Sequence, residues 1–190
     1  MPFTAPPSLK SARLQIRLVA ESDLRDLLAV NGDSEVTRFL PYAAWNSMAD
    51  ADAWYKRMSG MQAAGSALQF VVAEQRTGTA VGTCLLFRFE ETSARAELGY
   101  ALGRAHWGKG YMGEALAALI DCAFGSMALR RLEAEVDPGN LSSGRLLKRL
   151  GFTREGLLRQ RWVDKGKAHD VETYGLLRDE WPGSPQSGGV

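Results

Sequence analysis

A glycine-rich stretch, Trp107–Gly113, separates a strand-like run at Ala96–Leu102 from a helix-like run that begins near Glu114. Glycine lets the backbone approach an anion closely, and the unpaired N–H groups of a first helical turn favour negative charge there. The stretch therefore predicts a loop that holds a phosphate group. It also constrains the fold, because a strand, a loop and a helix must follow one another at this point.

Length and charge limit the classes of protein to which the chain can belong. Its 190 residues are 45% hydrophobic, which suits a single domain with one continuous core. The formal net charge is +1, so no global field attracts nucleic acid or an anionic membrane surface. We therefore expect neither nucleic acid nor a membrane among the partners, and any anion site must be local.

The two cysteines predict neither a disulfide scaffold nor a metal site. Cys84 and Cys122 lie in apolar runs, and no Cys or His pair has the spacing of metal ligands. We expect two buried thiols and no bound metal. Residues 1–7 lack a basic region followed by an apolar core, and no stretch approaches about 18 uncharged apolar residues, so we expect a cytoplasmic protein.

Hydrophobic periodicity predicts a mixed α/β domain. Strands are indicated at 14–18, 68–74, 80–89, 96–102, 131–136, 157–164 and 169–177, and helices start near residues 21, 47, 114 and 143. Short connections between the middle strands favour hairpins, so we expect a mostly antiparallel sheet flanked by helices, in one domain at residues 12–181. The termini at 1–11 and 182–190 are rich in Pro, Gly and Ser and are predicted to be flexible.

The glycine-rich loop also allows other interpretations. Gly108–Gly113 fits G-x-G-x-x-G, and Glu133 lies 20 residues beyond it, as in a dinucleotide-binding fold. However, five residues separate Leu102 from Gly108, Glu133 falls inside a strand, and the pattern offers a single strand–helix–strand crossover, which disfavours a dinucleotide. A Walker A loop is excluded because Lys109 is not part of a G-K-[S/T] ending. A glycine-rich turn without a ligand is the remaining alternative.

Several segments, taken in order, resemble the GNAT acyltransferases, and within them the ribosomal-protein N-acetyltransferase branch. They are Glu97–Leu102, Trp107–Tyr111, Glu114–Leu116, Asn140 with Ser143, Gly151–Phe152 and Glu155–Gly156, and the resemblance runs from about Leu14 to Trp181. The family's pyrophosphate pattern, Q/R-x-x-G-x-G/A, falls on Trp107, Gly110 and Met112. Trp107 and Met112 depart from this pattern. We expect Met112 to loosen the loop around the pyrophosphate, with Gly113 restoring the lost room.

The resemblance implies a GNAT-like acyl-CoA N-acyltransferase fold with acetyl-CoA as the acyl donor. The loop would take the pyrophosphate, the end of the strand at 96–102 would pair with the pantetheine arm, and Asn140 would bond the arm from the other side. Arg145 and Lys148 are candidates either for the adenosine 3′-phosphate or for a solvated helix face. The residues assigned to acetyl-CoA in this way are Tyr100, Ala101, Leu102, Trp107, Gly108, Lys109, Gly110, Tyr111, Met112, Gly113, Asn140, Ser143, Arg145 and Lys148.

Glu97 is the preferred base for acyl transfer to an amine. On an extended strand it shares a face with Gly99 and Ala101, two small residues that leave space for a substrate, and it could relay a proton through water. The structural alternative is an ion pair with Arg88 or Arg95, because a charged residue on a strand is more often paired or solvated than catalytic.

Ser143 is the candidate proton donor for the CoA thiolate, because the resemblance places this serine beside the sulfur. Its structural alternative is a helix N-cap. The oxyanion donor is implied to be a backbone N–H near Ala101 or Leu102. His106 and His169 lie away from the expected position of the base, so we expect surface or structural roles for both.

The acceptor is predicted to be a primary amine, and a peptide N-terminus is favoured. An α-amine is roughly 10–30% neutral near pH 7.2, whereas a lysine amine is neutral at only about 0.1% or less, so a single indirect base suits the former. Small amines such as polyamines, antibiotics or amino acids, a non-catalytic acyl-CoA-binding module and a dinucleotide oxidoreductase are the alternatives, and the chain is compatible with a homodimer. The acceptor site is expected at Phe39, Leu40, Tyr42, Trp45 and Trp162, for which apolar core is the default interpretation.

Overall fold

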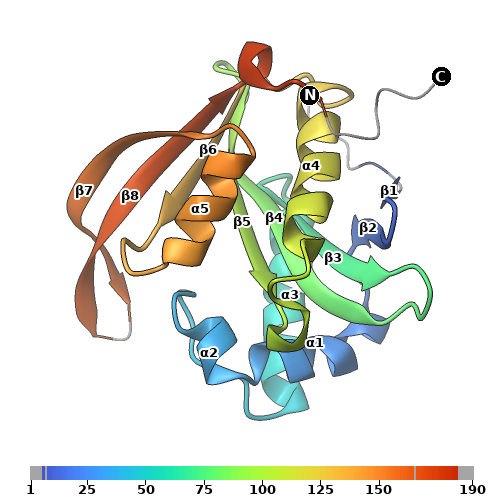
Figure 1. Ribbon diagram of the computed structural model, residues 1–190. Coiled ribbons are helices and arrows are strands. Elements are labelled where there is room, and N and C mark those ends of the chain that lie inside the picture. The colour runs from blue at the N-terminus through green and yellow to red at the C-terminus, as the bar shows by residue number, and fades with distance from the viewer. Residues whose placement is uncertain (1–5, 7, 165, 184–190) are drawn as a thin grey trace.

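The computed structural model describes residue 6, residues 8–164 and residues 166–183, which form one eight-stranded sheet with helices on both faces (Figure 1). The strands are β1 Leu9–Lys10, β2 Leu14–Leu18, β3 Ala67–Glu74, β4 Ala80–Glu90, β5 Arg95–Leu102, β6 Arg131–Val136, β7 Thr153–Asp164 and β8 Lys167–Leu177. The α-helices are α1 Leu24–Asn31, α2 Ser34–Thr37, α3 Met48–Ala63, α4 Tyr111–Phe124 and α5 Leu141–Arg149. Short 3₁₀ turns lie at Glu21–Asp23, Arg104–His106 and Arg178–Glu180.

The strand order across the sheet is β1-β2-β3-β4-β5-β6-β8-β7. Among the described strands, β5 and β6 form the one parallel pair, and the other neighbours are antiparallel. The predicted mixed, mostly antiparallel sheet is therefore confirmed. The single parallel pair is joined by α4, as a crossover between parallel strands requires.

The two faces of the sheet have separate cores because β3 and β4 are buried on both sides. Phe70 faces the α4 side, where it joins Leu116 and Ile120 in the larger core. Its neighbour Val71 faces the opposite side and packs with residues of α1 and α3, including Trp54. A strand buried on both faces reads as a continuous apolar run, as β3 does. Each large apolar side chain buried in this way contributes about 1.5–3 kcal/mol.

The parallel pair holds together over only part of its length. Arg95, Ala96 and Glu97 of β5 are in register with β6, and the pairing ends at Glu97 and Glu133. β5 continues to Leu102 and β6 to Val136, so the two strands diverge beyond this point. The backbone edge of β5 that faces β6 is thus left open to a ligand.

The structure corrects several predicted boundaries. Residues 9 and 10 form β1 and pair with β2, although residues 1–11 were expected to lie outside the fold. The penultimate strand begins at Thr153 rather than at residue 157, and α2 was not predicted at all. Residues 1–5, 7, 165 and 184–190, which include part of both predicted flexible termini, lie outside the described residues.

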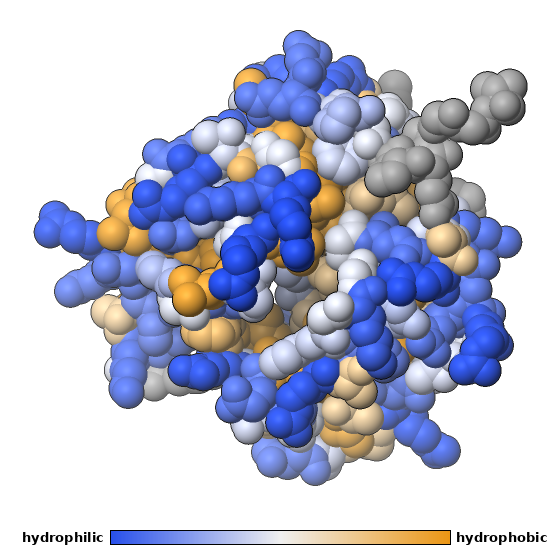
Figure 2. Space-filling model, in the orientation of Figure 1, coloured by the Kyte–Doolittle hydropathy of each residue, from blue (hydrophilic) through white to orange (hydrophobic). Residues whose placement is uncertain are grey.

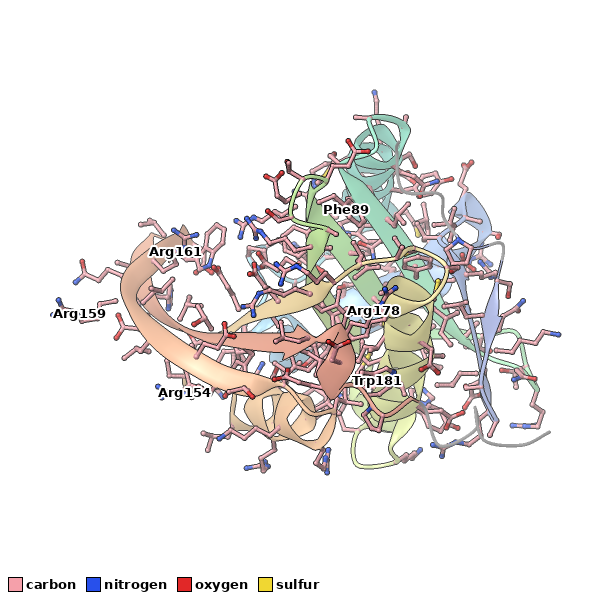
Figure 3. The ribbon with its side chains drawn as sticks, turned by 90° about the horizontal axis from the view of Figure 1, so that it is seen from above. Phe89, Arg154, Arg159, Arg161, Arg178 and Trp181 are labelled. Atoms are coloured by element: carbon pink, nitrogen blue, oxygen red, sulfur yellow. The ribbon has the colours of Figure 1, made fainter. Side chains whose placement is uncertain are left out.

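Two further predictions about the chain can be compared with the structure. Cys84 and Cys122 are free and buried, as expected. In the described part of the chain no helix is long and apolar enough to cross a membrane. After β8 the chain returns to α4, where the Trp181 indole donates a hydrogen bond to Asp121 at 2.7 Å (Figure 3).

Candidate active site

A cleft of about 2130 Å³ opens where β5 and β6 diverge. Its walls come from the start of α4, one face of α5, the ends of β5 and β6, the segment after α2 and the tip of the β7–β8 hairpin. Figure 2 shows the hollow, with hydrophobic side chains in its depth and hydrophilic side chains around its rim. Typical small-molecule pockets measure roughly 300–1,000 Å³, so this cleft has room for two substrates at once.

The glycine-rich loop forms the start of α4 on one side of the cleft. Gly108 and Gly110 have φ values of 73° and 78°, a region that residues with a Cβ rarely adopt. Gly110 is the N-cap of α4, and both glycines line the cleft. The free N–H groups of the first turn are therefore presented next to the cleft, as an anion site at a helix N-terminus requires.

The Met112 side chain is directed into the core, and its effect on the tightness of the loop stays a prediction. Its side chain is 6% exposed and its sulfur lies 3.8 Å from the Cys84 sulfur, inside the core beneath α4. The position lies in the first turn of the helix, where a long apolar side chain turns toward the sheet. A Cβ on Gly113 would lie 3.5 Å from a methyl carbon of Leu146 on α5, an ordinary contact distance, so packing does not require glycine here.

The end of β5 presents backbone groups to the cleft. The Gly103 N–H donates to the Val81 carbonyl of β4 at 2.8 Å, so the Leu102 carbonyl, on the other side of the same trans peptide, points away from β4. The Trp107 indole N–H donates to that carbonyl at 2.7 Å. In an extended strand the N–H and C=O of one residue point the same way, so the Leu102 N–H also faces the gap toward β6.

The N-cap of α5 is Asn140 and not Ser143. The Asn140 side chain accepts a hydrogen bond from the Ser143 N–H at 3.2 Å and from the Ser142 hydroxyl at 2.9 Å. This leaves the Ser143 hydroxyl free of capping, and it lies 2.7 Å from the Tyr100 hydroxyl of β5. Burial raises the pKa of Tyr100 to about 12, so its hydroxyl keeps its proton at neutral pH. A pair of neutral hydroxyl groups therefore joins α5 to β5 across the cleft.

Arg145 and Lys148 do not line the cleft, whereas Arg149 does. The cleft face of α5 consists of Ser142, Ser143, Leu146, Arg149 and Leu150, which follow helical spacing. Arg145 and Lys148 lie outside this stripe and are exposed. The structure therefore favours the solvated-face alternative for both. Lys109 is likewise exposed and absent from the cleft wall.

Glu97 lies on the cleft wall and is 8% exposed. One carboxylate oxygen accepts a hydrogen bond from the Arg88 guanidinium at 2.7 Å, so the predicted ion pair is present, while Arg95 bonds Glu133 instead. Burial raises the pKa of Glu97, and the hydrogen bond from Arg88 opposes this effect. A carboxylate with a raised pKa in a cleft is a candidate base.

Arg88 owes its position to an irregularity in β4. Its φ is 51°, and the register of β4 with β5 shifts between Phe87 and Glu90. Left-handed backbone at a residue other than glycine is uncommon and concentrates at functional sites. The guanidinium also lies 4.7 Å from the centre of the Trp162 ring, within the range of a cation–π contact. No sequence pattern indicates a bulge at this place.

Four of the five predicted acceptor-site residues line the cleft, namely Phe39, Leu40, Tyr42 and Trp162. Trp45 does not line it. The Trp45 ring is 7% exposed and packs at 5.4 Å against Trp54 of α3, so the default interpretation of apolar core holds for this residue. Trp162 reaches the cleft from β7 and donates to a Glu135 carboxylate oxygen at 2.5 Å.

The two histidines differ in their surroundings. His106 lies in the turn before the loop, also lines the cleft and stacks on Tyr111 at 5.6 Å. His169 lines the cleft, with Nε2 at 3.0 Å from an Asp164 carboxylate oxygen and Nδ1 at 3.6 Å from one of Asp137. Among the described residues no group of three or more His, Cys, Asp or Glu is placed to hold a metal ion.

A helix N-terminus that can take a phosphate, an open strand edge beside it and a carboxylate across the cleft together define an N-acyltransferase that uses an acyl-CoA. The family model for the acetyltransferase (GNAT) domain matches residues 13–153. The chain belongs to this family and is an acetyl-CoA-dependent N-acetyltransferase.

Three similar proteins illustrate the breadth of the family. The uncharacterized N-acetyltransferase p20 of Bacillus licheniformis is 36% identical over 93% of this chain and 99% of the relative. The [ribosomal protein uS5]-alanine N-acetyltransferase of Escherichia coli (strain K12) is 32% identical over 91% of this chain and 92% of the relative. The crystal structure of spermidine N-acetyltransferase from Vibrio cholerae with CoA and spermine has a TM-score of 0.76 at 20% identity, and it covers 88% of this chain and 96% of that one. The last comparison shows the fold alone.

Proposed function

We propose that the protein transfers the acetyl group of acetyl-CoA to the α-amine at the N-terminus of a peptide or protein. The observation that carries the proposal is the hydrogen bond from Arg88 to Glu97 at 2.7 Å. This bond opposes the rise in pKa that burial gives Glu97, so it limits the strength of the carboxylate as a base. Such a base suits an acceptor that supplies its own neutral fraction, which is roughly 10–30% for an α-amine near pH 7.2 and about 0.1% or less for lysine.

In the proposed reaction the acetyl-CoA lies along the open edge of β5. The N–H groups of Gly108–Gly113 take the pyrophosphate, and the Leu102 N–H, which faces the gap, stabilises the oxyanion of the tetrahedral intermediate. The acceptor nitrogen attacks the thioester carbonyl and loses a proton to Glu97, directly or through water. When the carbon–sulfur bond breaks, the Ser143 hydroxyl, held in place by Tyr100, donates its proton to the thiolate. Ser143 regains a proton from water, and Glu97 releases to water the proton taken from the amine.

The relatives support the same direction without deciding the substrate. The Escherichia coli relative, whose name assigns it to the alanine of ribosomal protein uS5, is 32% identical over most of both chains. At this identity the substrate does not transfer automatically, because the acceptor wall is built from loops and from the β7–β8 hairpin, which vary more easily than the core.

A small polyamine is the second candidate acceptor, and the charge of the acceptor wall favours it. Glu97, Glu135, Asp137 and Asp164 all line the cleft. Arg88 and Arg161 pair with the two glutamates, so the aspartates are the groups that can attract a second ammonium group. A basic side chain near the N-terminus of a peptide would use the same charges. The two candidates are therefore separated by experiment rather than by electrostatics.

The test is acceptor profiling at pH 7.2 with release of free CoA as the readout. The first acceptors are peptides that begin with alanine, serine or methionine and are otherwise identical. The second set is the same peptides with an acetylated N-terminus and an internal lysine. Spermidine and an aminoglycoside are the small-molecule acceptors. We expect the highest kcat/KM for a free N-terminus and no turnover of the blocked peptides. Preference for spermidine would replace the first candidate with the second.

A further inference from the structure

We propose that Arg13, in the turn between β1 and β2, is a positioning residue that orients the phosphate-binding loop for acetyl-CoA. The proposal rests on the assignment of the pyrophosphate to Gly108–Gly113 made above. Arg13 lies outside the family's pyrophosphate pattern. It directly precedes β2, which pairs with β1 and with β3, and the residues of β1 were expected to be part of a flexible terminus.

Arg13 contacts the loop and the first turn of α4 through four interactions. Its Nη1 donates to the Lys109 carbonyl at 3.0 Å, and its Nε donates to Glu114 Oε2 at 2.7 Å. Its backbone N–H donates to Glu114 Oε1 at 2.7 Å. The guanidinium also lies 4.4 Å from the centre of the Tyr111 ring, and the Tyr111 hydroxyl is itself bonded to Glu74 at 2.9 Å.

The bond to the Lys109 carbonyl fixes the direction of the next N–H group. In a trans peptide the C=O and the following N–H point in opposite directions, so holding the Lys109 oxygen on the Arg13 side turns the Gly110 N–H to the other side. Gly108 and Gly110 line the cleft, whereas Lys109 does not. The carbonyl is thus held away from the position of the phosphate and the N–H is left to face it.

This orientation needs to be held because of the residues that flank it. Gly108 and Gly110 both have positive φ, and glycine populates positive and negative φ about equally. The Lys109–Gly110 peptide rotates through ψ of Lys109 and φ of Gly110, so the conformational freedom of Gly110 eases this rotation. In the opposite orientation the peptide would present the Lys109 carbonyl oxygen to the phosphate. A guanidinium that selects one orientation before binding reduces the ordering cost of the complex.

Arg13 also balances a negative charge next to the anion site. Glu114 lies in the first turn of α4, where its carboxylate would repel a bound phosphate. The Ser11 hydroxyl and the Arg13 backbone N–H bond one carboxylate oxygen, and Arg13 Nε bonds the other. Burial by itself raises the pKa of Glu114, but these hydrogen bonds outweigh it and lower the pKa, so the group is an anion that Arg13 neutralises.

The first experiment measures the Kd of CoA by titration calorimetry. Arg13→Met removes hydrogen bonds made by a charged guanidinium, and the free energy of such bonds corresponds to a Kd of CoA about 10–100 times higher in the variant. Arg17→Met is the matched control, because Arg17 lies on β2 and forms a comparable pair with Asp23 at 2.7 Å. The control is expected to lower the Tm and leave the Kd of CoA within about twofold.

The second experiment separates the pyrophosphate from the rest of the donor. S-acetylpantetheine has no pyrophosphate, so with this donor Arg13→Met is expected to keep kcat/KM within about twofold of the wild type. With acetyl-CoA as the donor, the same variant should lose kcat/KM and retain kcat. Arg13→Lys keeps the charge but lacks the planar fork, so most of the defect should persist in it. A Lys variant equal to the wild type would overturn the role of the carbonyl contact.

Two other outcomes distinguish the possible failures. If the wild type does not prefer acetyl-CoA to S-acetylpantetheine, the pyrophosphate assignment fails and the proposal falls with it. If the wild type has that preference but Arg13→Met loses the same factor on both donors, the assignment stands and Arg13 is only a structural residue. The calorimetric arm needs no acceptor, so it gives an answer even if the proposed peptide is not a substrate.

Discussion

At the scale of the residue, Glu97 shows how two interpretations of one side chain can both hold. Strand alternation placed it on the face of Gly99 and Ala101, and it lies on the cleft wall. The alternative, an ion pair with Arg88, is also present. Pairing and catalysis do not exclude each other, because a carboxylate has two oxygens and Arg88 bonds one of them. The bulge that aims Arg88 has no sequence signal, since neither glycine nor proline marks it.

Replacement of Glu97 by glutamine tests the proposed base. Glu97→Gln should lower turnover by roughly 10²–10⁴ at neutral pH with the Kd of CoA nearly unchanged, because the amide keeps the shape but cannot accept a proton. The defect should shrink as the pH rises toward the pKa of the acceptor, which then supplies neutral amine by itself. Turnover between pH 6.5 and 9.5 checks this. A defect indifferent to pH and accompanied by a lower Tm would mean that Glu97 is structural.

Replacement of Arg88 tests how the pKa of Glu97 is set. Burial raises this pKa, the carboxylates of Glu135 and Glu133 add to the rise, and the bond and charge of Arg88 lower it. Arg88→Met removes the lowering influence, so the pKa of Glu97 should rise further. The base works only when deprotonated, so the acid limb of the kcat/KM profile should move to higher pH. A profile between pH 5.5 and 9 that matches the wild type would contradict this.

The hydroxyl pair of Tyr100 and Ser143 makes a different prediction. If Tyr100 orients the Ser143 hydroxyl, Tyr100→Phe should lower kcat by about 2–10-fold, the range of a neutral hydrogen bond, and have little further effect in a Ser143→Ala background. Tyr174→Phe is the matched control, because this buried tyrosine packs under Gly144 of the same helix but donates to Glu172. Equal losses in both phenylalanine variants would contradict a specific role for Tyr100.

At the scale of the element, most helices and strands could be predicted, whereas β1, α2 and the ends of several others could not. β1 is two residues long and β7 is exposed along most of its length, so neither carries a period-two apolar signal. Figure 3 shows Arg159 and Arg161 on the part of this strand that lies away from the helices. On α5, Arg145 and Lys148 looked suitable for a phosphate, but the rotation of the helix turns Arg149 to the cleft instead.

Two glycines on adjacent strands provide a test of the open edge of β5. A Cβ on Gly82 of β4 would lie 2.5 Å from the Ala101 carbonyl oxygen and 3.2 Å from the Leu102 Cα. Gly82→Ala should therefore push β5 away from β4, which lowers the Tm and raises the KM for acetyl-CoA. A Cβ on Gly99 would meet Leu85 and Phe87 at 3.8 Å, an ordinary contact distance.

Gly99→Ala should accordingly fold with an unchanged Tm. Its methyl group would face the side of Glu97, so it should raise the KM of the acceptor more than that of acetyl-CoA. Thermal melting and two-substrate kinetics on both alanine variants make the comparison. If both variants raised the KM for acetyl-CoA equally, the division of β5 into a donor edge and an acceptor face would be wrong.

At the scale of the whole molecule, the sheet consists of two parts joined by a short parallel contact. β1–β5 and β6–β8 are linked across the sheet by the register of Arg95–Glu97 with Arg131–Glu133, and the cleft lies beyond this link. The hairpins and the single crossover could be predicted, but the position of β8 between β6 and β7 was not part of the prediction. The divergence is implied by the family resemblance alone, because it depends on where two strands stop pairing and not on the composition of either.

Because the donor is expected to touch both parts of the sheet, its binding should stabilise the molecule as a whole. A ligand present at 100 times its Kd adds about 2.7 kcal/mol to the free energy of unfolding. For a domain of this size each kcal/mol raises the Tm by about 2–4 °C, so CoA should raise it by roughly 5–10 °C.

NAD at the same concentration should leave the Tm within about 1 °C, because the loop follows a 3₁₀ turn and the sheet has a single parallel crossover, unlike a dinucleotide fold. Melting curves with CoA, NAD and S-acetylpantetheine make the measurement. An equal rise with NAD would contradict the assignment of the cleft to acetyl-CoA. At the same CoA concentration, a rise in Arg13→Met that is clearly smaller than the rise in Arg17→Met would place the gain at the phosphate loop.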